Sequence, residues 1–347
     1  MKSLSIVRPD DWHVHLRDGE ILAAVLPWTA RDFGRAVVMP NLKPPVATVA
    51  QALAYHERIL EVLPEEVSFE PLMTLYLTSA TKPDEISRLR GSAAMLGVKL
   101  YPAGATTHSE AGVRSLDDCA AVLEAMQKLD VPLMVHGEVT RPDVDVFDRE
   151  RIFLDEVLEP LRARFPALRV VLEHITTAEA VQYVELAGGR IGATITAHHL
   201  RYTRNAMFLG RDGWPGIRPH YYCLPVLKRE RHRLELVRAA TGGNPRFFLG
   251  TDSAPHARNT KETACGCAGC FTAPLAMPLY AQVFDDAGAL DRLEGFASFH
   301  GADFYGLPRN KTSITLVRGA PAEVPPILAG GKAFVPLGEG DTNWTVA

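Results

Sequence analysis

The stretch DWHVHLRDG, residues 11–19, carries the first side chains in the chain whose types and spacing could do chemistry. His13 and His15 stand two residues apart at the end of an apolar segment. In a β-strand, residues i and i+2 point to the same face, so both imidazoles can aim at one point while Val14 faces the other way. A lone histidine in such a place is more often a hydrogen-bonded structural residue. A same-face pair is typical of metal ligands.

Further residues able to bind a metal follow strand-like runs later in the chain, at Lys99, His136, His174 and Asp252. Lys99 and His136 are 37 residues apart, His136 and His174 are 38 apart, and His174 and Asp252 are 78 apart. These intervals correspond to one, one and two strand–helix units. We therefore expect the side chains to come from the ends of different strands and to meet at one edge of a sheet.

The elements that must position these residues alternate regularly along the chain. Eight strands are predicted, at residues 4–7 continuing to 13–16, 35–41, 68–78, 94–102, 131–138, 169–176, 190–199 and 246–254. Amphipathic helices are predicted between them, for example at residues 48–63, 115–129 and 150–165. Ser115 with Asp118 forms an acidic variant of the capping box at the start of the second of these.

This alternation predicts an α/β fold, a parallel sheet closed into a (β/α)8 TIM barrel. A doubly wound open sheet is the alternative, but no G-x-G-x-x-G motif follows the first strand. We find no repeat or linker, and expect one domain over residues 1–347. Residues 300–319 are predicted to form a loop and a short strand, a short C-terminal extension of the barrel.

Composition excludes several classes of function. The formal net charge is −4 and no basic run occurs, which argues against nucleic-acid binding. No window approaches ~18 uninterrupted apolar residues, so no membrane span or membrane partner is expected. Five cysteines in a chain without a signal-peptide pattern fit a reducing compartment, and we expect a cytoplasmic protein.

Four histidines and a carboxylate exceed what one tetrahedral zinc ion needs, which favours two metal ions. Lys99 lies in the apolar run AMLGVKLYP, where a charged ammonium is costly to bury. It could pair with a carboxylate or extend to the barrel mouth. Alternatively, desolvation keeps the amine neutral, so that it adds CO₂ and becomes a carbamate able to bridge two cations ~3.5–4 Å apart. The spacing alone does not decide between these.

Several motifs together resemble the shorter bacterial dihydroorotases of the amidohydrolase superfamily: HVHLRDG, VVMPNLKPPV, VKLYPAGATT, MVHGE, LEHITT and LGTDSAPHA. The resemblance extends from about residue 9 to about residue 308. The H-x-H motif alone marks only the superfamily, whereas MPNLKPP and CLPVLKRERHR are much more specific. This resemblance adds expectations that the spacing does not provide.

The resemblance implies a barrel that holds two zinc ions through the ligand positions of the family. His13, His15 and Asp252 would hold the more buried ion, His136 and His174 the other, and N6-carboxylated Lys99 would bridge both. The implied reaction is the reversible cyclisation of N-carbamoyl-L-aspartate to L-dihydroorotate in pyrimidine (UMP) biosynthesis. A hydroxide between the two ions would attack the ring amide carbon, with Asp252 as general acid and base. A homodimer is also implied.

Residues that contact the small-molecule substrate are expected around the metal ligands. By the resemblance, Arg17, Asn41 and His256 hold the substrate carboxylate, and Leu224 and Ala268 contact the ring through backbone groups. A guanidinium pairs bidentately with a carboxylate, which agrees with this role for Arg17. The alternative for Arg17 is a salt bridge with Asp18. The segment GATTHS is predicted to be a mobile lid, with Thr106 and Thr107 as its ligand contacts.

Some residues depart from the family pattern or have no assigned role. Gly104, His108 and His300 stand where asparagines are expected. The cluster CGCAGC, residues 265–270, has crowded thiols, but a fourth ligand is missing nearby. The resemblance implies a glycine-rich loop whose backbone approaches the substrate, and not a third metal site. His198 and His199 end the seventh strand, and only one of them is expected to face inward.

Two other functions remain open on the sequence. A hydantoinase or allantoinase would share the metal ligands but not the carboxylate clamp. A non-enzymatic dihydroorotase-like subunit would be expected to lose metal ligands, and this chain keeps all six.

Overall fold

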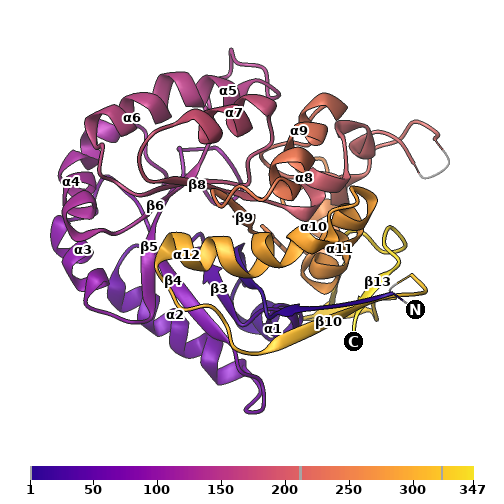
Figure 1. Ribbon diagram of the computed structural model, residues 1–347. Coiled ribbons are helices and arrows are strands. Elements are labelled where there is room, and N and C mark those ends of the chain that lie inside the picture. The colour runs from indigo at the N-terminus through magenta and orange to yellow at the C-terminus, as the bar shows by residue number, and fades with distance from the viewer. Residues whose placement is uncertain (1, 211–212, 322) are drawn as a thin grey trace.

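A barrel of parallel strands forms the centre of the molecule. The computed structural model describes residues 2–210, 213–321 and 323–347. Within these residues, eight parallel strands pair in chain order: β2 (Asp10–Val14), β3 (Arg35–Val38), β4 (Glu70–Tyr76), β5 (Met95–Leu100), β6 (Leu133–His136), β7 (Val170–Glu173), β8 (Ile191–Ile195) and β9 (Phe247–Leu249). The amide of Asp252 donates to the carbonyl of His13 (2.8 Å) and that of His15 to the carbonyl of Ser253 (3.0 Å), which joins the last strand to the first. The predicted (β/α)8 barrel is confirmed (Figure 1).

Helices surround the strands. They are α1 (Gly19–Asp32), α2 (Val49–Val62), α3 (Pro83–Arg90), α4 (Ala120–Leu129), α5 (Arg149–Phe153), α6 (Glu159–Arg164), α7 (Ala178–Leu186), α8 (Ala197–Arg201), α9 (Glu230–Thr241), α10 (Arg258–Lys261), α11 (Ala276–Asp286) and α12 (His300–Tyr305). Helix α2 matches the helix predicted over 48–63 and begins with a capping box formed by Thr48 and Gln51. In the described parts of the chain, no helix has the length and apolar character needed to cross a membrane.

Two predicted helices are less regular than their periodicity indicates. Over 115–129, the chain first forms a 3₁₀ turn (Leu116–Cys119) and only then α4. Ser115 does cap this segment, but its hydroxyl accepts from the amide of Asp117 and not from that of Asp118 as a capping box requires. Over 150–165, a π-helical turn (Leu154–Leu158) separates α5 from α6. Pro160 follows it and has no amide hydrogen to continue an α-helical ladder.

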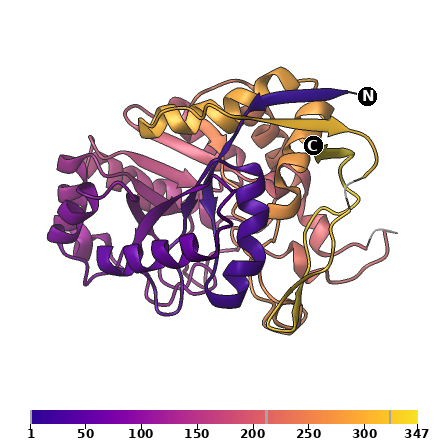
Figure 2. The same ribbon diagram turned by 90° about the horizontal axis from the view of Figure 1, so that it is seen from below.

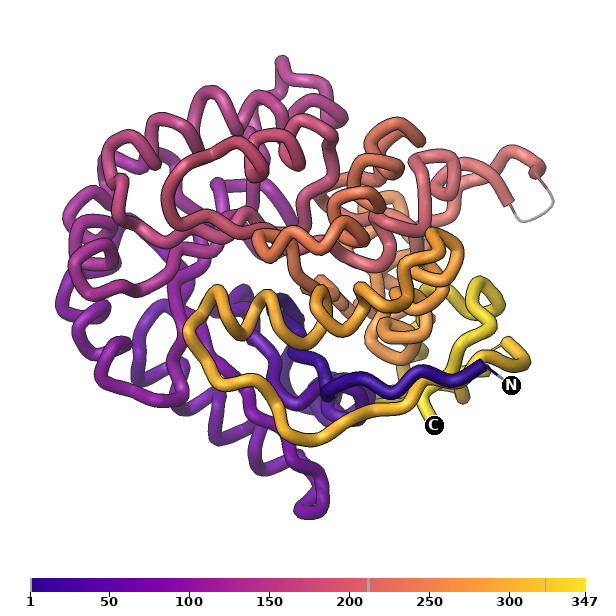
Figure 3. Tube along the Cα trace, viewed as in Figure 1, coloured from indigo at the N-terminus to yellow at the C-terminus, as the bar shows by residue number. Residues whose placement is uncertain are grey.

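The predicted first strand is wrong as a single element. Residues 4–7 belong to β1 (Ser3–Val7), which pairs antiparallel with β10 (Ser313–Arg318) in a separate sheet of order β1-β10-β13 (β13, Trp344–Val346). Figures 2 and 3 show β1 running beside β10 outside the barrel. Pro9 lies between β1 and β2 and cannot donate to a ladder, so the chain changes sheets there.

The C-terminal extension also differs from the expected loop and short strand. Residues 300–305 form α12, and a hairpin of β11 (Ile327–Ala329) and β12 (Lys332–Phe334) follows β10. Helix α12 closes the amino end of the barrel, where Arg169, one residue before β7, donates to the carbonyl of Phe304 (3.1 Å). The Tyr305 ring stacks on Trp12 with 4.7 Å between centroids. The opposite end of the barrel, where the strands have their carboxyl ends, is not covered by α12, and the polar residues lie there.

Candidate metal and substrate site

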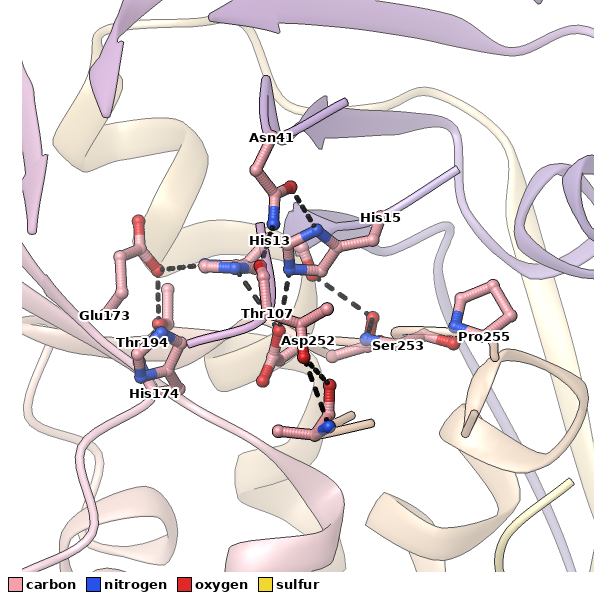
Figure 4. Close-up of polar contacts among 12 residues, drawn as sticks. His13, His15, Asn41, Thr107, Glu173, His174, Thr194, Asp252, Ser253 and Pro255 are labelled. Carbon is pink, nitrogen blue, oxygen red and sulfur yellow. Dashed lines mark hydrogen bonds and ion pairs between the residues drawn. The ribbon is translucent and has the colours of Figure 1, made fainter. Parts of the chain in front are cut away.

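The predicted metal ligands gather at the carboxyl end of the barrel. Lys99 lies in β5, His136 ends β6, and His13 lies one residue before the end of β2. His15, His174 and Asp252 lie just after β2, β7 and β9. Val14 packs in the core between strands and helices, as the strand alternation predicts, while His13 and His15 turn toward Asp252 (Figure 4).

His13, His15 and Asp252 form the tightest part of the site. Oδ1 of Asp252 lies 3.0 Å from Nε2 of His15 and 3.4 Å from Nε2 of His13. All three residues are buried, and their ligand atoms lie within 4.8 Å of one another. Burial lowers the pKa of His15 to about 4, so its imidazole is neutral, the form that binds metals.

The distal nitrogens of these two imidazoles are held by other residues. Nδ1 of His13 lies 2.9 Å from Oε2 of Glu173, and Nδ1 of His15 lies 2.8 Å from Oδ1 of Asn41. Because a carboxylate and an amide oxygen only accept, both histidines carry their proton on Nδ1. Their Nε2 lone pairs then face a carboxylate oxygen, an arrangement that needs a cation or a proton between them.

Glu173 was not predicted from the sequence, although it directly precedes His174. It is buried and also accepts from the hydroxyl of Thr194 (2.5 Å). The same kind of contact recurs at His136, whose Nε2 lies 2.7 Å from Oε2 of buried Glu138. Carboxylates in these positions fix the tautomer and orientation of a metal-binding histidine.

We expect Glu173→Gln to weaken metal binding without unfolding the barrel. An amide in this place can present its NH₂ group to Nδ1 of His13, which no longer favours the required tautomer. The affinity for zinc should fall roughly 10- to 100-fold. Competition with a chelator measures this, with Glu179→Gln on the exterior of α7 as the control. Unchanged zinc affinity in Glu173→Gln would show that His13 needs no such partner.

His174 and His136 complete the row of imidazoles. The His174 ring lies 5.0 Å from that of His13 and 4.8 Å from that of His136, measured between centroids. Burial holds the pKa of His174 well below its usual value, which keeps this ring neutral as well. The four histidines therefore form one continuous cluster. This is the arrangement that strand-end spacing predicts.

Lys99 is fully buried (0% exposed), and its Nζ lies 5.1 Å from the centroid of the Tyr101 ring, which lines the same cavity. Among the residues that the structure describes, Nζ of Lys99 has no hydrogen-bond partner. Burial lowers the pKa of its ammonium to about 8, with Glu173 and Asp252 acting in the opposite direction. A buried amine without a partner is costly as an ammonium, so the neutral, nucleophilic form is accessible near neutral pH.

Several of these side chains are held in uncommon backbone conformations. Arg17 (φ 61°), His174 (φ 40°) and Asp252 (φ 45°) are non-glycine residues in the left-handed region. Such conformations cost of order 1 kcal/mol or more each and persist where the surroundings enforce them. At Asp252, burial raises the pKa, but the close approach of the carboxylate to the imidazoles of His15, His13 and His174 outweighs burial and holds this pKa well below its usual value.

Most of the predicted substrate residues lie around the same small cavity. It is lined by the predicted residues His13, His15, Arg17, Asn41, Thr106, Thr107, His136, His174, Leu224, Asp252 and Ala268, together with Tyr101, Ala254 and Gly269. Lys99 and His256 are not part of the lining. Nε2 of His256 lies 3.0 Å from both Nη2 of Arg17 and the carbonyl of Ala268, so His256 contacts two residues of the wall.

Arg17 does not form the salt bridge with Asp18 that the sequence left open. Its Nε donates to the carbonyl of Pro255 (3.0 Å), while Asp18 pairs with Arg58 (2.8 Å). Burial and the charge of Arg17 lower the pKa of His256, so this imidazole stays neutral beside the guanidinium. The positive charge of Arg17 is therefore held at the edge of the cavity by neutral groups.

Two residues of the GATTHS segment, Thr106 and Thr107, line the cavity. The hydroxyl of Thr107 donates to the carbonyl of Ala268 (3.3 Å) and accepts from the amide of Ala268 (3.2 Å). Ser109 bonds both the amide and the carbonyl of Thr106. The cavity beneath measures about 20 Å³, close to the space that one water molecule needs. An organic ring does not fit this space unless part of the cavity wall moves.

Comparison with known proteins agrees with this geometry. The model of the amidohydrolase family matches residues 6–317. The dihydroorotase of Ralstonia nicotianae is 65% identical over 342 residues, covering 98% of this chain and 97% of that protein. The dihydroorotase of Saccharomyces cerevisiae in complex with 5-fluoroorotic acid superimposes with a TM-score of 0.89 at 32% identity, covering 100% and 99% of the two chains. That of Campylobacter jejuni gives 0.88 at 33% identity, covering 99% and 97%.

The aligned residues cover the barrel and its C-terminal extension. They therefore include every strand that carries a candidate site residue. The chain therefore belongs to the amidohydrolase family and, within it, to the dihydroorotases, hydrolases of pyrimidine biosynthesis.

Proposed function

We propose that this protein catalyses the reversible cyclisation of N-carbamoyl-L-aspartate to L-dihydroorotate with two zinc ions bridged by N6-carboxylated Lys99. The observation that carries the metal proposal is the convergence of Nε2 of His13 and Nε2 of His15 on one oxygen of Asp252, together with a buried Lys99 amine that has no hydrogen-bond partner among the described residues. The proposed ligands are His13, His15 and Asp252 for one ion, His136 and His174 for the other, and Lys99 for both.

The residues present fit this pair of cations. Neutral imidazoles and a carboxylate are the donors that zinc prefers, and the hydrogen bonds from Nδ1 of His13 and His15 leave Nε2 free to bind. Addition of CO₂ to Nζ of Lys99, with release of one N–H proton to solvent, converts the neutral amine into a carbamate anion with two oxygens. This satisfies an otherwise costly buried group and supplies a negative charge between two positive ones.

The chain's own residues account for the remaining chemistry. When bound, the two ions would supply Lewis acidity and lower the pKa of water. Asp252 is a carboxylate at neutral pH because its pKa is depressed, so it can accept a proton from the attacking water at a carboxylate oxygen and pass it to the leaving ring nitrogen. Arg17 holds the substrate carboxylate, and the GATTHS segment excludes bulk water.

The carboxylate role of Arg17, Asn41 and His256 rests on charge and position. Arg17 is a cation at the edge of the cavity, and Asn41 lines it beside His15. The yeast relative binds 5-fluoroorotic acid, a pyrimidine that carries a carboxylic acid, which supports a ligand of this kind. Leu224 and Ala268 would contact the ring through their backbone groups.

Arg17→Met should impair substrate binding without loss of metal. The charge-assisted pair with the substrate carboxylate disappears, so kcat/KM for dihydroorotate should fall on the order of 10²-fold or more. Metal content should stay at the wild-type value. Arg58→Met removes the ion pair with Asp18 and the contacts of this guanidinium with Ala54 and Tyr55; it is the matched control and should keep nearly full activity. Loss of metal from Arg17→Met would make Arg17 a structural residue.

The GATTHS segment should open and close during turnover. Thr106 and Thr107 are the proposed ligand contacts, and the cavity is too small for a ring with the segment in its present position. Limited proteolysis should therefore cut this segment more slowly when 5-fluoroorotic acid is bound. Cleavage at the exposed residues 214–217 serves as an internal control and should not change. Equal cleavage of residues 104–109 with and without the ligand would indicate a static loop.

The rival activity is hydrolysis of another cyclic amide such as hydantoin. Hydantoin has no carboxylate, so Arg17 would have no partner in its complex. The purified protein should turn over dihydroorotate with a kcat/KM at least 10²-fold above that for hydantoin, the scale of a lost charged pair. Equal or better turnover of hydantoin would overturn the assignment of substrate. Lack of activity on both would favour a non-enzymatic subunit.

A further inference from the structure

Lys261 is a buried lysine that no step of the proposed reaction uses. It ends α10 and is only 2% exposed. Its Nζ donates to three backbone carbonyls, those of Tyr222 (2.8 Å), Cys267 (2.7 Å) and Gly269 (2.8 Å). A lysine has three N–H donors only as an ammonium, so this geometry holds a positive charge inside the protein. Burial lowers the pKa of Lys261, and the three carbonyl dipoles offset this cost.

Two loops of the cavity wall meet at this ammonium. The loop after α10 contains the CGCAGC cluster and supplies two of the three carbonyls, and the loop before α9 supplies that of Tyr222. The amide of Gly269 also donates to the carbonyl of Tyr222 (3.0 Å), which joins the loops directly. Both loops reach the substrate cavity, through Leu224 and Ala268. Lys261 is therefore bonded to the backbone on both sides of this wall.

The carbonyl groups alternate in direction along the CGCAGC loop. Those of Cys267 and Gly269 point to Lys261. That of Ala268, which lies between them, accepts from the hydroxyl of Thr107 (3.3 Å). In a trans peptide, the C=O and N–H groups point in opposite directions. The peptide between Cys267 and Ala268 thus accepts from the ammonium on one side and donates to the hydroxyl of Thr107 on the other (3.2 Å).

We propose that Lys261 is a positioning residue for the GATTHS segment: its ammonium fixes the orientation of one peptide, and that peptide holds Thr107 in the cavity lining. A hydrogen bond from a charged donor is stronger than one from a neutral donor. It also polarises the peptide, so that the amide of Ala268 becomes a better donor to the threonine hydroxyl. The effect on catalysis rests on the proposed function, because this segment acts on the reaction only by closing over the substrate.

Hydrogen exchange tests this connection without reference to activity. The exchange rate of residues 104–109 is measured by mass spectrometry in the ligand-free, metal-loaded protein. Wild type is compared with Lys261→Met, Thr107→Val and the double variant. Methionine has a similar length but neither the charge nor the donors. Each single substitution should speed exchange roughly 10-fold, the scale of one lost charge-assisted hydrogen bond.

The double variant distinguishes positioning from a general loss of stability. Both single substitutions break the same connection, so the double variant should exchange no faster than the faster single variant. Independent effects would instead multiply to about 100-fold and would overturn the proposal. Lys261→Gln keeps a donor and guards against misfolding of Lys261→Met. It should speed exchange by a smaller factor and should also not add to Thr107→Val. Unchanged exchange in both Lys261 variants would contradict the proposal as well.

Lys228→Met is the matched control. Lys228 is also buried (4% exposed), and its Nζ donates to the carbonyl of Val226 (3.2 Å), which does not line the cavity. Its substitution should leave the exchange of residues 104–109 unchanged. An effect as large as that of Lys261→Met would show that the loss of any buried lysine loosens the segment, and the assignment to Lys261 would be wrong.

Steady-state kinetics then show how the connection acts on the reaction. In Lys261→Met, KM for dihydroorotate should rise roughly 10-fold, because binding must also close a segment that is now less often closed. The value of kcat should change much less, and metal content should stay at the wild-type value. A fall in kcat with unchanged KM would place Lys261 in the reaction itself and overturn the positioning role. Wild-type protein without activity on dihydroorotate would contradict the proposed function and leave the exchange results standing.

Discussion

Lys99→Ala should lose nearly all activity, on the order of 10³-fold or more in kcat, which corresponds to at least about 4 kcal/mol of transition-state stabilisation. The alanine removes the amine that we propose to carry the bridging carbamate. Without this anion two cations would face each other with less negative charge between them, so the variant should also hold less metal. Metal analysis and a dihydroorotate assay on the same sample measure both effects.

Partial rescue distinguishes a missing ligand from a damaged fold. Removal of the buried Lys99 side chain leaves space where its amine stood, and a small carboxylic acid such as acetate can supply two oxygens there. Activity of Lys99→Ala should therefore rise with added acetate, whereas wild type should not respond. A fully active Lys99→Ala protein with two zinc ions would contradict the bridging role.

The depressed pKa of Lys99 gives this ligand a pH dependence. Only the neutral amine adds CO₂, and its fraction increases as pH rises toward the pKa of about 8. After acid treatment and removal of metal, recovery of activity with bicarbonate and zinc should therefore be faster at alkaline than at acidic pH. Recovery that is equally fast at both would argue against a titrating amine as the site of addition.

Asp252→Asn should abolish both directions of the reaction. Asparagine is a poor ligand in this position and cannot carry a proton between the attacking water and the ring nitrogen. Its amide would also carry no negative charge to hold a cation beside Nε2 of His13 and Nε2 of His15. Hydrolysis of dihydroorotate and cyclisation of carbamoyl aspartate should each fall by about 10³-fold or more, the combined cost of a lost ligand and a lost general base.

Wild-type rates should depend on pH in opposite ways in the two directions. Ring opening releases a proton and ring closure consumes one, so the rate of hydrolysis should rise with pH to a plateau while that of synthesis falls. Asp252 itself is ionised well below neutral pH, so the limbs near neutrality belong to the coupled unit of water, cations and carboxylate. If Asp252→Asn slowed one direction and left the other near wild type, a shared proton carrier would be ruled out.

The strand-end residues were predictable because the barrel itself fixes their place. Once the chain alternates strands and helices, His136 and His174 must lie at neighbouring strand ends, and the i, i+2 rule brings His13 and His15 to one face. The residues that orient them were not predictable. Glu173 reaches His13 across the barrel, a contact between positions 160 residues apart that no local pattern contains.

The errors in the fold have similar causes. The β1–β2 segment has the composition of one strand, and only the pairing of β1 with β10, some 300 residues away, separates it from the barrel. Helix α12 is too short for periodicity to identify and is stabilised by packing on Trp12. His300 stands where an asparagine was expected. It lies at the start of α12, and its Nδ1 lies 3.0 Å from the carbonyl of Phe247, so its role is structural.

The most direct test of the catalytic proposal is the metal dependence of dihydroorotate turnover. The purified protein is stripped with a chelator, assayed in both directions, and assayed again after zinc and bicarbonate are restored, with metal content measured at each stage. We predict that the stripped protein is inactive in both directions and that hydrolysis and cyclisation return together as the metal is restored. Full activity of the metal-free protein on dihydroorotate would contradict the account.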